Sequence, residues 1–150
     1  MSWIDAYRTE GRLEGRCLCG GVRITVHGPH IAAVGVCHCA MCQRWAGYAF
    51  GSFRAPVASV TVEGEVRSHA SSSFATRAFC PTCGSHLWMR YGEGDYDLQP
   101  GLFPGAADFP LVSEIYTDRA PAYVSLQGEH RRATRAEYEA REPHVEGDAP

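Results

Sequence analysis

Residues 36–50 read VCHCAMCQRWAGYAF, and this stretch decides the fold that we expect for the whole chain. Its cysteines, Cys37, Cys39 and Cys42, can converge on one metal ion only if the backbone bends tightly around that ion. Three protein ligands leave a tetrahedral zinc ion one free coordination position, as in catalytic zinc sites. The stretch therefore predicts an open zinc site that is followed at once by aromatic and cationic side chains.

The other four cysteines form two further clusters, Cys17-Leu18-Cys19-Gly20 and Cys80-Pro81-Thr82-Cys83-Gly84. Glycine after the second cysteine lets backbone amides turn toward sulfur without a Cβ clash. Three clusters that contain all seven cysteines indicate metal binding. Disulfides are the weaker explanation, because a chain without an export signal is expected in a reducing compartment and an odd count leaves one cysteine over.

Seven thiol ligands divide into a closed structural site of four and an open site of three. Spacing alone leaves two pairings open. In one, the C-x-x-C halves of the second and third clusters form an ordinary zinc ribbon. In the other, the first and third clusters form the site of four, and the second cluster stays by itself. We favour the second pairing, because it keeps the three-thiol run intact.

The composition fits one globular domain, since 45% of the 150 residues are hydrophobic and 21% are charged. No apolar run approaches the roughly 18 residues of a membrane span, and the N-terminus lacks the layout of a signal peptide. A formal net charge of -3 is unfavourable for a general nucleic-acid binder. We expect a cytoplasmic protein that binds neither membrane nor nucleic acid, and a homodimer is left open. The single domain spans residues 1–150, with a core at about 13–125 and a frayed tail at 143–150.

Short runs of apolar and β-branched residues between Gly, Pro and Ser predict an all-β architecture of small antiparallel sheets. The predicted strands cover residues 21–28, 31–36, 48–53, 57–62, 65–69, 74–79, 86–91 and 113–116. The Pro- and Gly-rich residues 100–110 are expected to cross the surface. Residues 133–141 contain good helix formers and predict a short C-terminal helix, and Arg131, Arg132 and Arg135 are expected on its solvated face.

Three motifs together carry a family resemblance: Cys-x-Cys-Gly at 17–20, Cys-His-Cys-x-x-Cys-Gln-Arg at 37–44 and Phe-Cys-Pro-Thr-Cys-Gly-Ser at 79–85. They resemble the glutathione-dependent formaldehyde-activating enzyme family, also called the GFA or CENP-V family. The resemblance runs from about Cys17 to Tyr123 and is looser over residues 115–123. It implies a β-tent fold of small antiparallel sheets held by zinc knuckles. It also implies two zinc ions, a structural one on Cys17, Cys19, Cys80 and Cys83, and a catalytic-type one on Cys37, Cys39 and Cys42.

Three thiolates leave a zinc dication with a net charge of about -1, so bound water is acidified less than on zinc held by neutral histidines. Such a soft site accepts one more sulfur, and an incoming thiol would be deprotonated beside an electrophile. This favours formation or cleavage of a carbon-sulfur bond. The resemblance implies glutathione as co-substrate and its condensation with formaldehyde to S-hydroxymethylglutathione. We therefore expect a carbon-sulfur lyase that acts on a small thiol or thiol adduct.

Residues that follow the second cluster are candidates for binding that substrate. Arg44 would hold a carboxylate, and Trp45, Tyr48 and Phe50 would form an apolar wall. Core packing is the stronger explanation for the aromatic residues, and a surface ion pair is the stronger one for Arg44. His38 lies between two ligands, so its side chain is expected to point away from the metal, with a role as a proton shuttle left open. His86 is a candidate fourth ligand or acid-base group. The remaining five histidines carry no signal.

Two other functions stay open. One is a non-catalytic zinc module whose aromatic surface binds a protein, and a histidine that completes the three-cysteine site would favour it. The other is a thiol-based redox or zinc-responsive protein, which predicts zinc release by mild peroxide with reversible disulfides in the second cluster.

Overall fold

The computed structural model describes residues 2–145 and divides into two compact units. The first unit comprises Met1–Ala33 and Ser52–Pro110, and the second comprises Val34–Gly51 and Leu111–Pro150. The chain passes from the second unit to the first within strand β6 (Phe50–Ala55) and returns after Pro110. The expected single domain over residues 1–150 is not tested by this division and stays a prediction.

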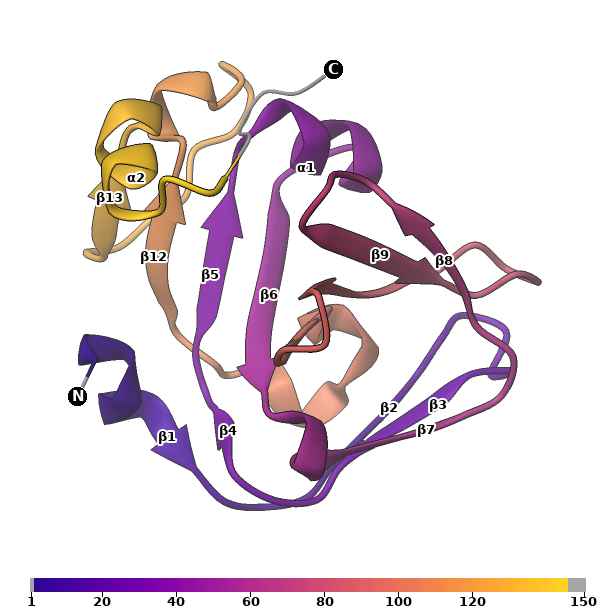
Figure 1. Ribbon diagram of the computed structural model, residues 1–150. Coiled ribbons are helices and arrows are strands. Elements are labelled where there is room, and N and C mark those ends of the chain that lie inside the picture. The colour runs from indigo at the N-terminus through magenta and orange to yellow at the C-terminus, as the bar shows by residue number, and fades with distance from the viewer. Residues whose placement is uncertain (1, 146–150) are drawn as a thin grey trace. The chain divides into compact units, whose positions relative to one another are not determined.

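One antiparallel sheet of the first unit contains β2 (Leu13–Arg16), β3 (Arg23–Val26) and β7 (Val60–Glu63), with β3 in the centre (Figure 1). Side chains alternate along β3 as the sequence predicts, since Ile24 and Val26 are buried and Arg23 is exposed. The turn between β2 and β3 carries the first cysteine cluster.

A second antiparallel sheet of the first unit orders its strands β6-β11-β10-β9-β8. Its members are residues 53–55 of β6, β8 (Arg67–Ala70), β9 (Ala75–Phe79), β10 (His86–Tyr91) and β11 (Tyr96–Leu98). The unit also contains a two-stranded pair and four 3-10 turns: β1 (Arg8–Thr9), β4 (His30–Ile31), η1 (Trp3–Tyr7), η2 (Val57–Ser59), η3 (Pro100–Leu102) and η4 (Pro104–Ala106). The turn between β9 and β10 carries the third cysteine cluster.

The connection over residues 100–110 was predicted to cross the surface, but Phe103 and Ala106 within it are buried. The prediction is therefore wrong for the middle of the connection. Phe103 is only 1% exposed and packs edge-on against Phe53, with ring centroids 5.3 Å apart. Gly15 makes this possible, because a Cβ there would lie 2.6 Å from the Phe103 ring. A glycine on β2 and an aromatic residue almost ninety positions later therefore form one contact that no local pattern reveals.

The sheet of the second unit is parallel, which corrects the expectation of antiparallel sheets throughout. β12 (Leu111–Ile115) lies between β5 (Val34–Cys37) and β13 (Arg131–Ala133), and both pairings are parallel (Figure 1). Parallel strands need long connections, whereas the turns that sequence patterns reveal join antiparallel neighbours. Arg131 and Arg132 belong to β13 and not to the C-terminal helix, which is a second correction.

Two helices complete the second unit, together with η5 (Thr117–Arg119). The C-terminal helix is confirmed as α2 (Arg135–Arg141), and Thr134 caps it by accepting a hydrogen bond from the Glu137 amide. Helix α1 (Ala40–Ala46) was not predicted. Cys39 is its N-cap, and Gly47 ends it with a left-handed φ of 74°.

The mostly β architecture of small sheets with a short C-terminal helix is thus confirmed. Within residues 2–145, no helix is both long and apolar enough to span a membrane. Of the tail expected to fray, residues 146–150 lie outside the described part of the chain.

Candidate metal centres

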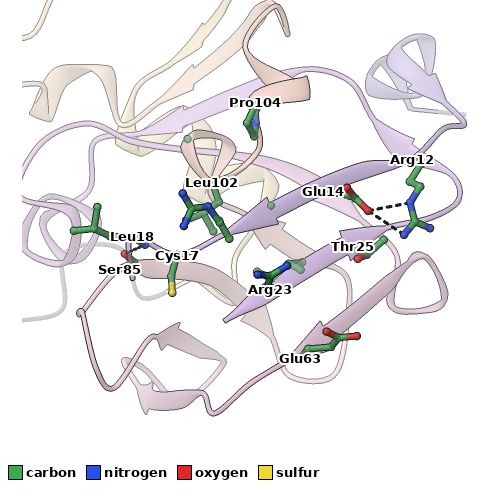
Figure 2. Close-up of a pocket in the computed structure, with 14 residues that line it drawn as sticks. Arg12, Glu14, Cys17, Leu18, Arg23, Thr25, Glu63, Ser85, Leu102 and Pro104 are labelled. Carbon is green, nitrogen blue, oxygen red and sulfur yellow. Dashed lines mark hydrogen bonds and ion pairs between the residues drawn. The ribbon is translucent and has the colours of Figure 1, made fainter. Parts of the chain in front are cut away.

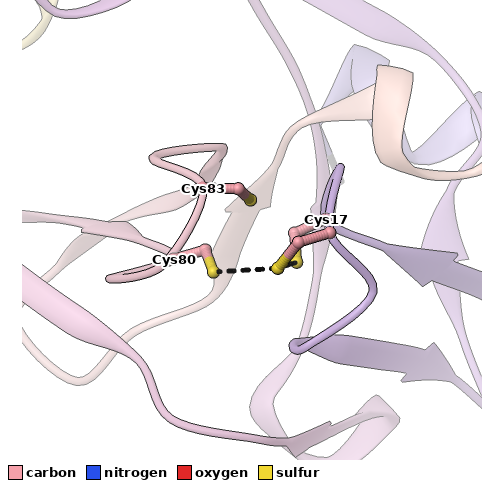
Figure 3. A group of neighbouring side chains, drawn as sticks. Cys17, Cys80 and Cys83 are labelled. Atoms are coloured by element: carbon pink, nitrogen blue, oxygen red, sulfur yellow. Dashed lines mark hydrogen bonds between the residues drawn. The ribbon is translucent and has the colours of Figure 1, made fainter.

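The first and third cysteine clusters meet in the first unit. The ligand atoms of Cys17, Cys19, Cys80 and Cys83 all lie within 4.8 Å of one another. The Sγ atom of Cys19 is 3.6 Å from that of Cys17 and 3.8 Å from that of Cys80. Figure 3 shows the thiols of Cys80 and Cys83 facing Cys17 from the opposite turn.

The backbone around this group of four also suits a metal ion. The amide of Val22 donates to Cys17 Sγ at 3.2 Å, and the amide of Gly21 donates to Cys19 Sγ at 3.4 Å. Such donors stabilise thiolates, which are the form that binds a soft cation. Four thiols in a tetrad with amide donors fit zinc by the chemistry of the donor set.

The thiols of this group differ in acidity. The Ser85 hydroxyl, 3.2 Å from Cys83 Sγ, is the main group that lowers the pKa of Cys83 to about 5. For Cys19, the Gly21 amide lowers the pKa, but the neighbouring thiols of Cys17, Cys83 and Cys80 outweigh it and raise the value to about 11. The four thiols thus have different surroundings, although their ligand atoms lie within 4.8 Å of one another.

The second cluster forms a group of its own in the second unit. Cys37 ends β5, Cys39 caps α1, and Cys42 lies in the first turn of that helix, so that their ligand atoms also lie within 4.8 Å of one another. The Cys42 amide donates to Cys39 Sγ at 3.4 Å. Among residues 2–145, no histidine, aspartate or glutamate joins the three thiols as a fourth ligand. The structure thus groups the seven cysteines as four and three, and each group is able to bind a metal ion.

Hydrogen bonds from neighbouring elements hold the backbone of this cluster. The His38 amide donates to the Ile115 carbonyl at 3.1 Å, at the end of β12. The Gln43 side-chain amide donates to the carbonyls of His38 and Arg119, at 2.7 and 2.8 Å. Gln43 was not singled out from the sequence as a residue that shapes the site, although it belongs to the cysteine motif.

A buried carboxylate lies beside the cluster. His38 Nε2 is 2.7 Å from Glu114 Oε1, and His130 Nε2 contacts Glu114 Oε2. Both histidine side chains are fully buried and the Glu114 side chain is 8% exposed. The His38 ring thus binds Glu114, whereas the importance of Glu114 and His130 was missed, because these residues lie 76 and 92 positions from His38.

The predicted substrate residues lie on or just after α1. Arg44 and Tyr48 are exposed, and Trp45 is partly buried. Tyr48 stacks on Tyr123 with ring centroids 6.0 Å apart, so Tyr123 is a further aromatic residue that the sequence did not single out. Their roles in binding stay predictions. His86 lies in β10 of the first unit, outside the group of four thiols.

A cavity of about 720 Å³ lies in the first unit beside the group of four thiols, and it was not anticipated from the sequence. Figure 2 shows Arg12, Glu14 and Arg23 among its walls, with Arg12 paired to Glu14 at 3.1 Å. Cys17 and Ser85 line one part of it. Apolar side chains such as Leu18 and Leu102 also line this cavity, so its surface is partly polar and partly apolar.

Short β-sheets with one group of four and one group of three thiols define a small, cysteine-rich metal-binding protein. The chain belongs to the glutathione-dependent formaldehyde-activating enzyme family, whose sequence profile matches residues 12–119. It is 32% identical to an uncharacterized lyase of Schizosaccharomyces pombe over 113 residues, which cover 72% of this chain and 80% of the relative. It is also 32% identical over 128 residues to a putative glutathione-dependent formaldehyde-activating enzyme of Halomonas elongata, covering 77% and 81% of the two chains.

A solved structure supports the fold. The crystal structure of a Rhodobacter sphaeroides protein matches with a TM-score of 0.53 and 22% sequence identity, covering 66% of this chain and 99% of that chain. At this level of identity the likeness concerns the fold alone.

Proposed function

We propose that this protein is a zinc-dependent carbon-sulfur lyase with a β-tent fold, acting on a glutathione-like thiol adduct. The observation that carries the proposal is the group of Cys37, Cys39 and Cys42, which lacks a fourth ligand among residues 2–145. Family membership and a relative named as a lyase support the reaction class.

The two thiol groups would have different roles. Cys17, Cys19, Cys80 and Cys83 would hold a structural zinc ion, since four thiolates complete a tetrahedron. Cys37, Cys39 and Cys42 would hold a second zinc ion, which when bound lowers the pKa of an incoming thiol and keeps it as a thiolate. The Cys42 amide, which donates to Cys39 Sγ, offsets part of the negative charge that three thiolates concentrate there.

The proposed reaction forms one bond and moves one proton. The thiolate sulfur of glutathione attacks the carbonyl carbon of formaldehyde, the carbon-oxygen π bond breaks, and the proton lost by the thiol is returned to the oxygen. No oxidant or reductant is needed, and the reverse reaction cleaves the same carbon-sulfur bond. A cytoplasmic location, as expected from the sequence, would keep both the ligand thiols and the substrate thiol reduced.

Exposed residues near the second cluster would bind the rest of the substrate. Arg44, in the last turn of α1, would pair with a glutathione carboxylate. The stacked rings of Tyr48 and Tyr123 and the partly buried Trp45 would offer apolar surface. These binding roles are our proposals for individual side chains, and they assume the glutathione-like substrate that family membership suggests.

The test is a turnover measurement on the full chain loaded with zinc. Carbon-13 formaldehyde and glutathione would be mixed at low concentration, and NMR exchange spectroscopy would report the rate of adduct formation. We expect an acceleration that depends on protein and disappears in Cys39→Ser, whereas Arg44→Ala retains the reaction with a raised KM for glutathione. An unaccelerated rate in protein that contains two zinc ions would overturn the proposed activity.

A further inference from the structure

We propose that Glu114 is a positioning residue that fixes the bend of the Cys37–Cys42 segment by holding the rings of His38 and His130 from its two carboxylate oxygens. This inference rests on metal binding by the three thiols, which is part of the proposed function. It does not depend on lyase chemistry. Its consequence is that His130, far from the cysteines in sequence, controls how tightly the three thiols retain a metal ion.

The carboxylate occupies a central place in the parallel sheet. Glu114 lies on β12, opposite Val36 of β5 on one side and Arg132 of β13 on the other. His38 follows the end of β5, and His130 precedes the start of β13. One side chain on β12 therefore connects a residue next to β5 with a residue next to β13.

Chemistry dictates the direction of both hydrogen bonds. An ionised carboxylate only accepts hydrogen bonds, so the Nε2 atom of each imidazole is the donor. Burial raises the pKa of Glu114, but the hydrogen bonds from His130 and His38 outweigh it and lower the value below its ordinary range. Arg132 Nε, 3.4 Å from Glu114 Oε2, adds a positive group beside the oxygen that His130 contacts.

Each ring depends on this carboxylate for its orientation. The Nδ1 atoms of His38 and His130 are buried and have no hydrogen-bond partner among residues 2–145. The bond from Nε2 to Glu114 is thus the one side-chain hydrogen bond that orients each ring within the described part of the chain. Without it, a buried polar ring loses a bond worth roughly 1.5–3 kcal/mol, because the acceptor is charged.

His38 transmits that orientation to the thiols. Its ring is held by Glu114, its amide by the Ile115 carbonyl, and its carbonyl by the Gln43 side chain. Cys37 and Cys39 are its two chain neighbours, so a shift of the His38 backbone displaces both sulfur atoms. Ligand geometry is sensitive to such outer hydrogen bonds, whose loss commonly lowers metal affinity 10- to 100-fold.

The experiment compares His130→Ala with His130→Gln in the full chain loaded with zinc. Gln can place an amide N–H where Nε2–H lies in histidine, so this variant conserves the donor. Zinc transfer to a chromogenic chelator would give the affinity of each site. Cobalt substitution would identify the sites, because the visible spectra of four-thiolate and three-thiolate centres differ. His69→Ala, an exposed residue on β8 of the first unit, is the matched control.

We expect His130→Ala to weaken metal binding by the three thiols about 10-fold or more and to leave the four-thiol site unchanged. His130→Gln should recover most of the affinity, and His69→Ala should resemble the native protein. Should His130→Ala fail to fold, Glu114→Gln provides the second variant. Its amide can still accept from one ring but presents N–H to the other, so we expect the same selective loss.

An equal loss of metal affinity at both sites in His130→Ala would overturn the inference. It would also be overturned if that variant were less stable but its three thiols bound metal as tightly as in the native protein. A native protein that binds metal only at the four-thiol site would overturn it as well. Two bound metals and the selective loss, without any catalysed turnover, would refute the lyase proposal alone. Catalysed turnover with no effect of His130→Ala would refute the positioning role alone.

Discussion

Cysteine residues in the two thiol groups differ in what surrounds them, and this difference separates their contributions to stability. Cys17 and Cys80 belong to the hydrophobic core of the first unit and pack with Val22, Phe53 and Leu87. Cys39 instead caps a helix, where its sulfur accepts a hydrogen bond from the Cys42 amide. A change at Cys80 therefore disturbs the core, whereas one at Cys39 disturbs a helix end.

Replacing single ligands should reveal this difference. We expect Cys80→Ser to lose the cooperative unfolding transition, because it removes a metal ligand and leaves a hydroxyl in the core. Cys39→Ser should stay folded with one metal ion fewer per chain, since serine is a good N-cap for α1. Circular dichroism and metal content per chain would measure both outcomes. Equal loss of folding in the two variants would contradict the separation into structural and open sites.

We expect Asp97 to destabilise the folded protein at neutral pH, because its carboxylate is largely buried in β11. Burial raises its pKa from the ordinary 3.8 to about 6, and Arg54, at 3.7 Å, compensates only in part. Between these two values the folded protein binds more protons than the unfolded chain, so stability falls as pH rises. The full penalty, at pH values above the folded pKa, is about 3 kcal/mol.

Asp97→Asn should remove this penalty. We expect the variant to be more stable than the native protein at pH 8, and the gain to shrink by roughly 1 kcal/mol at pH 5. Urea unfolding with saturating zinc would measure the free energy of unfolding of both proteins. Because both contain the same cysteines, the effect of cysteine titration cancels when the two values are subtracted. A stability difference that does not change between pH 5 and pH 8 would show that Asp97 has an ordinary pKa.

Whole elements depend on close backbone approaches that only glycine allows. Gly64 follows β7 with a φ of +101°, and a Cβ there would lie 2.0 Å from the Gly21 carbonyl oxygen. Gly21 immediately precedes Val22 and the start of β3, next to Cys19. The position of β7 against β3 is therefore coupled to the turn that presents two metal ligands.

We expect Gly64→Ala to destabilise the protein by roughly 2 kcal/mol or more, because the clash is with backbone and the left-handed φ is strained for alanine. Gly101→Ala is the matched control, since the space around its Cβ position is open to 4 Å and its φ lies outside the left-handed region. Denaturant unfolding of both variants would check this. Equal stability of the two would mean that β7 shifts without cost.

At the scale of the whole molecule, metal binding and folding should be one process in the first unit. Its core includes Cys17 and Cys80 beside residues of both antiparallel sheets. Binding of a structural zinc ion commonly supplies about 10 kcal/mol or more to a small domain, which is comparable to its total stability. A metal ion on the four thiols would thus supply stability that a core of short strands lacks.

Removal of metal by a strong chelator should therefore unfold this unit. We expect the near-ultraviolet circular dichroism of Trp88, which packs edge-on against Tyr96 at 5.0 Å, to disappear and to return when zinc is added. Addition of magnesium in place of zinc should not restore it, because thiolates select soft cations. A chelated protein that keeps this signal and unfolds cooperatively would contradict the coupling.

Much of the fold was predictable where the signal is local. The alternation along β3, the strand at His86–Tyr91 and the short C-terminal helix all follow from patterns of a few residues. Helix α1 was missed, since its seven residues are hidden within a cysteine motif and its cap is a cysteine. The contact of Gly15 with Phe103 was missed because it joins distant parts of the chain.

The family, the mostly β architecture and the three cysteine clusters could all be predicted from the sequence, because cysteine spacing and short-range periodicity are properties of adjacent residues. Only the tertiary structure decided that β5, β12 and β13 pair in parallel, and that Glu114 lies between His38 and His130. Glu114 meets the two histidines because β12 pairs with β5 and β13, and this pairing depends on the packing of the whole second unit.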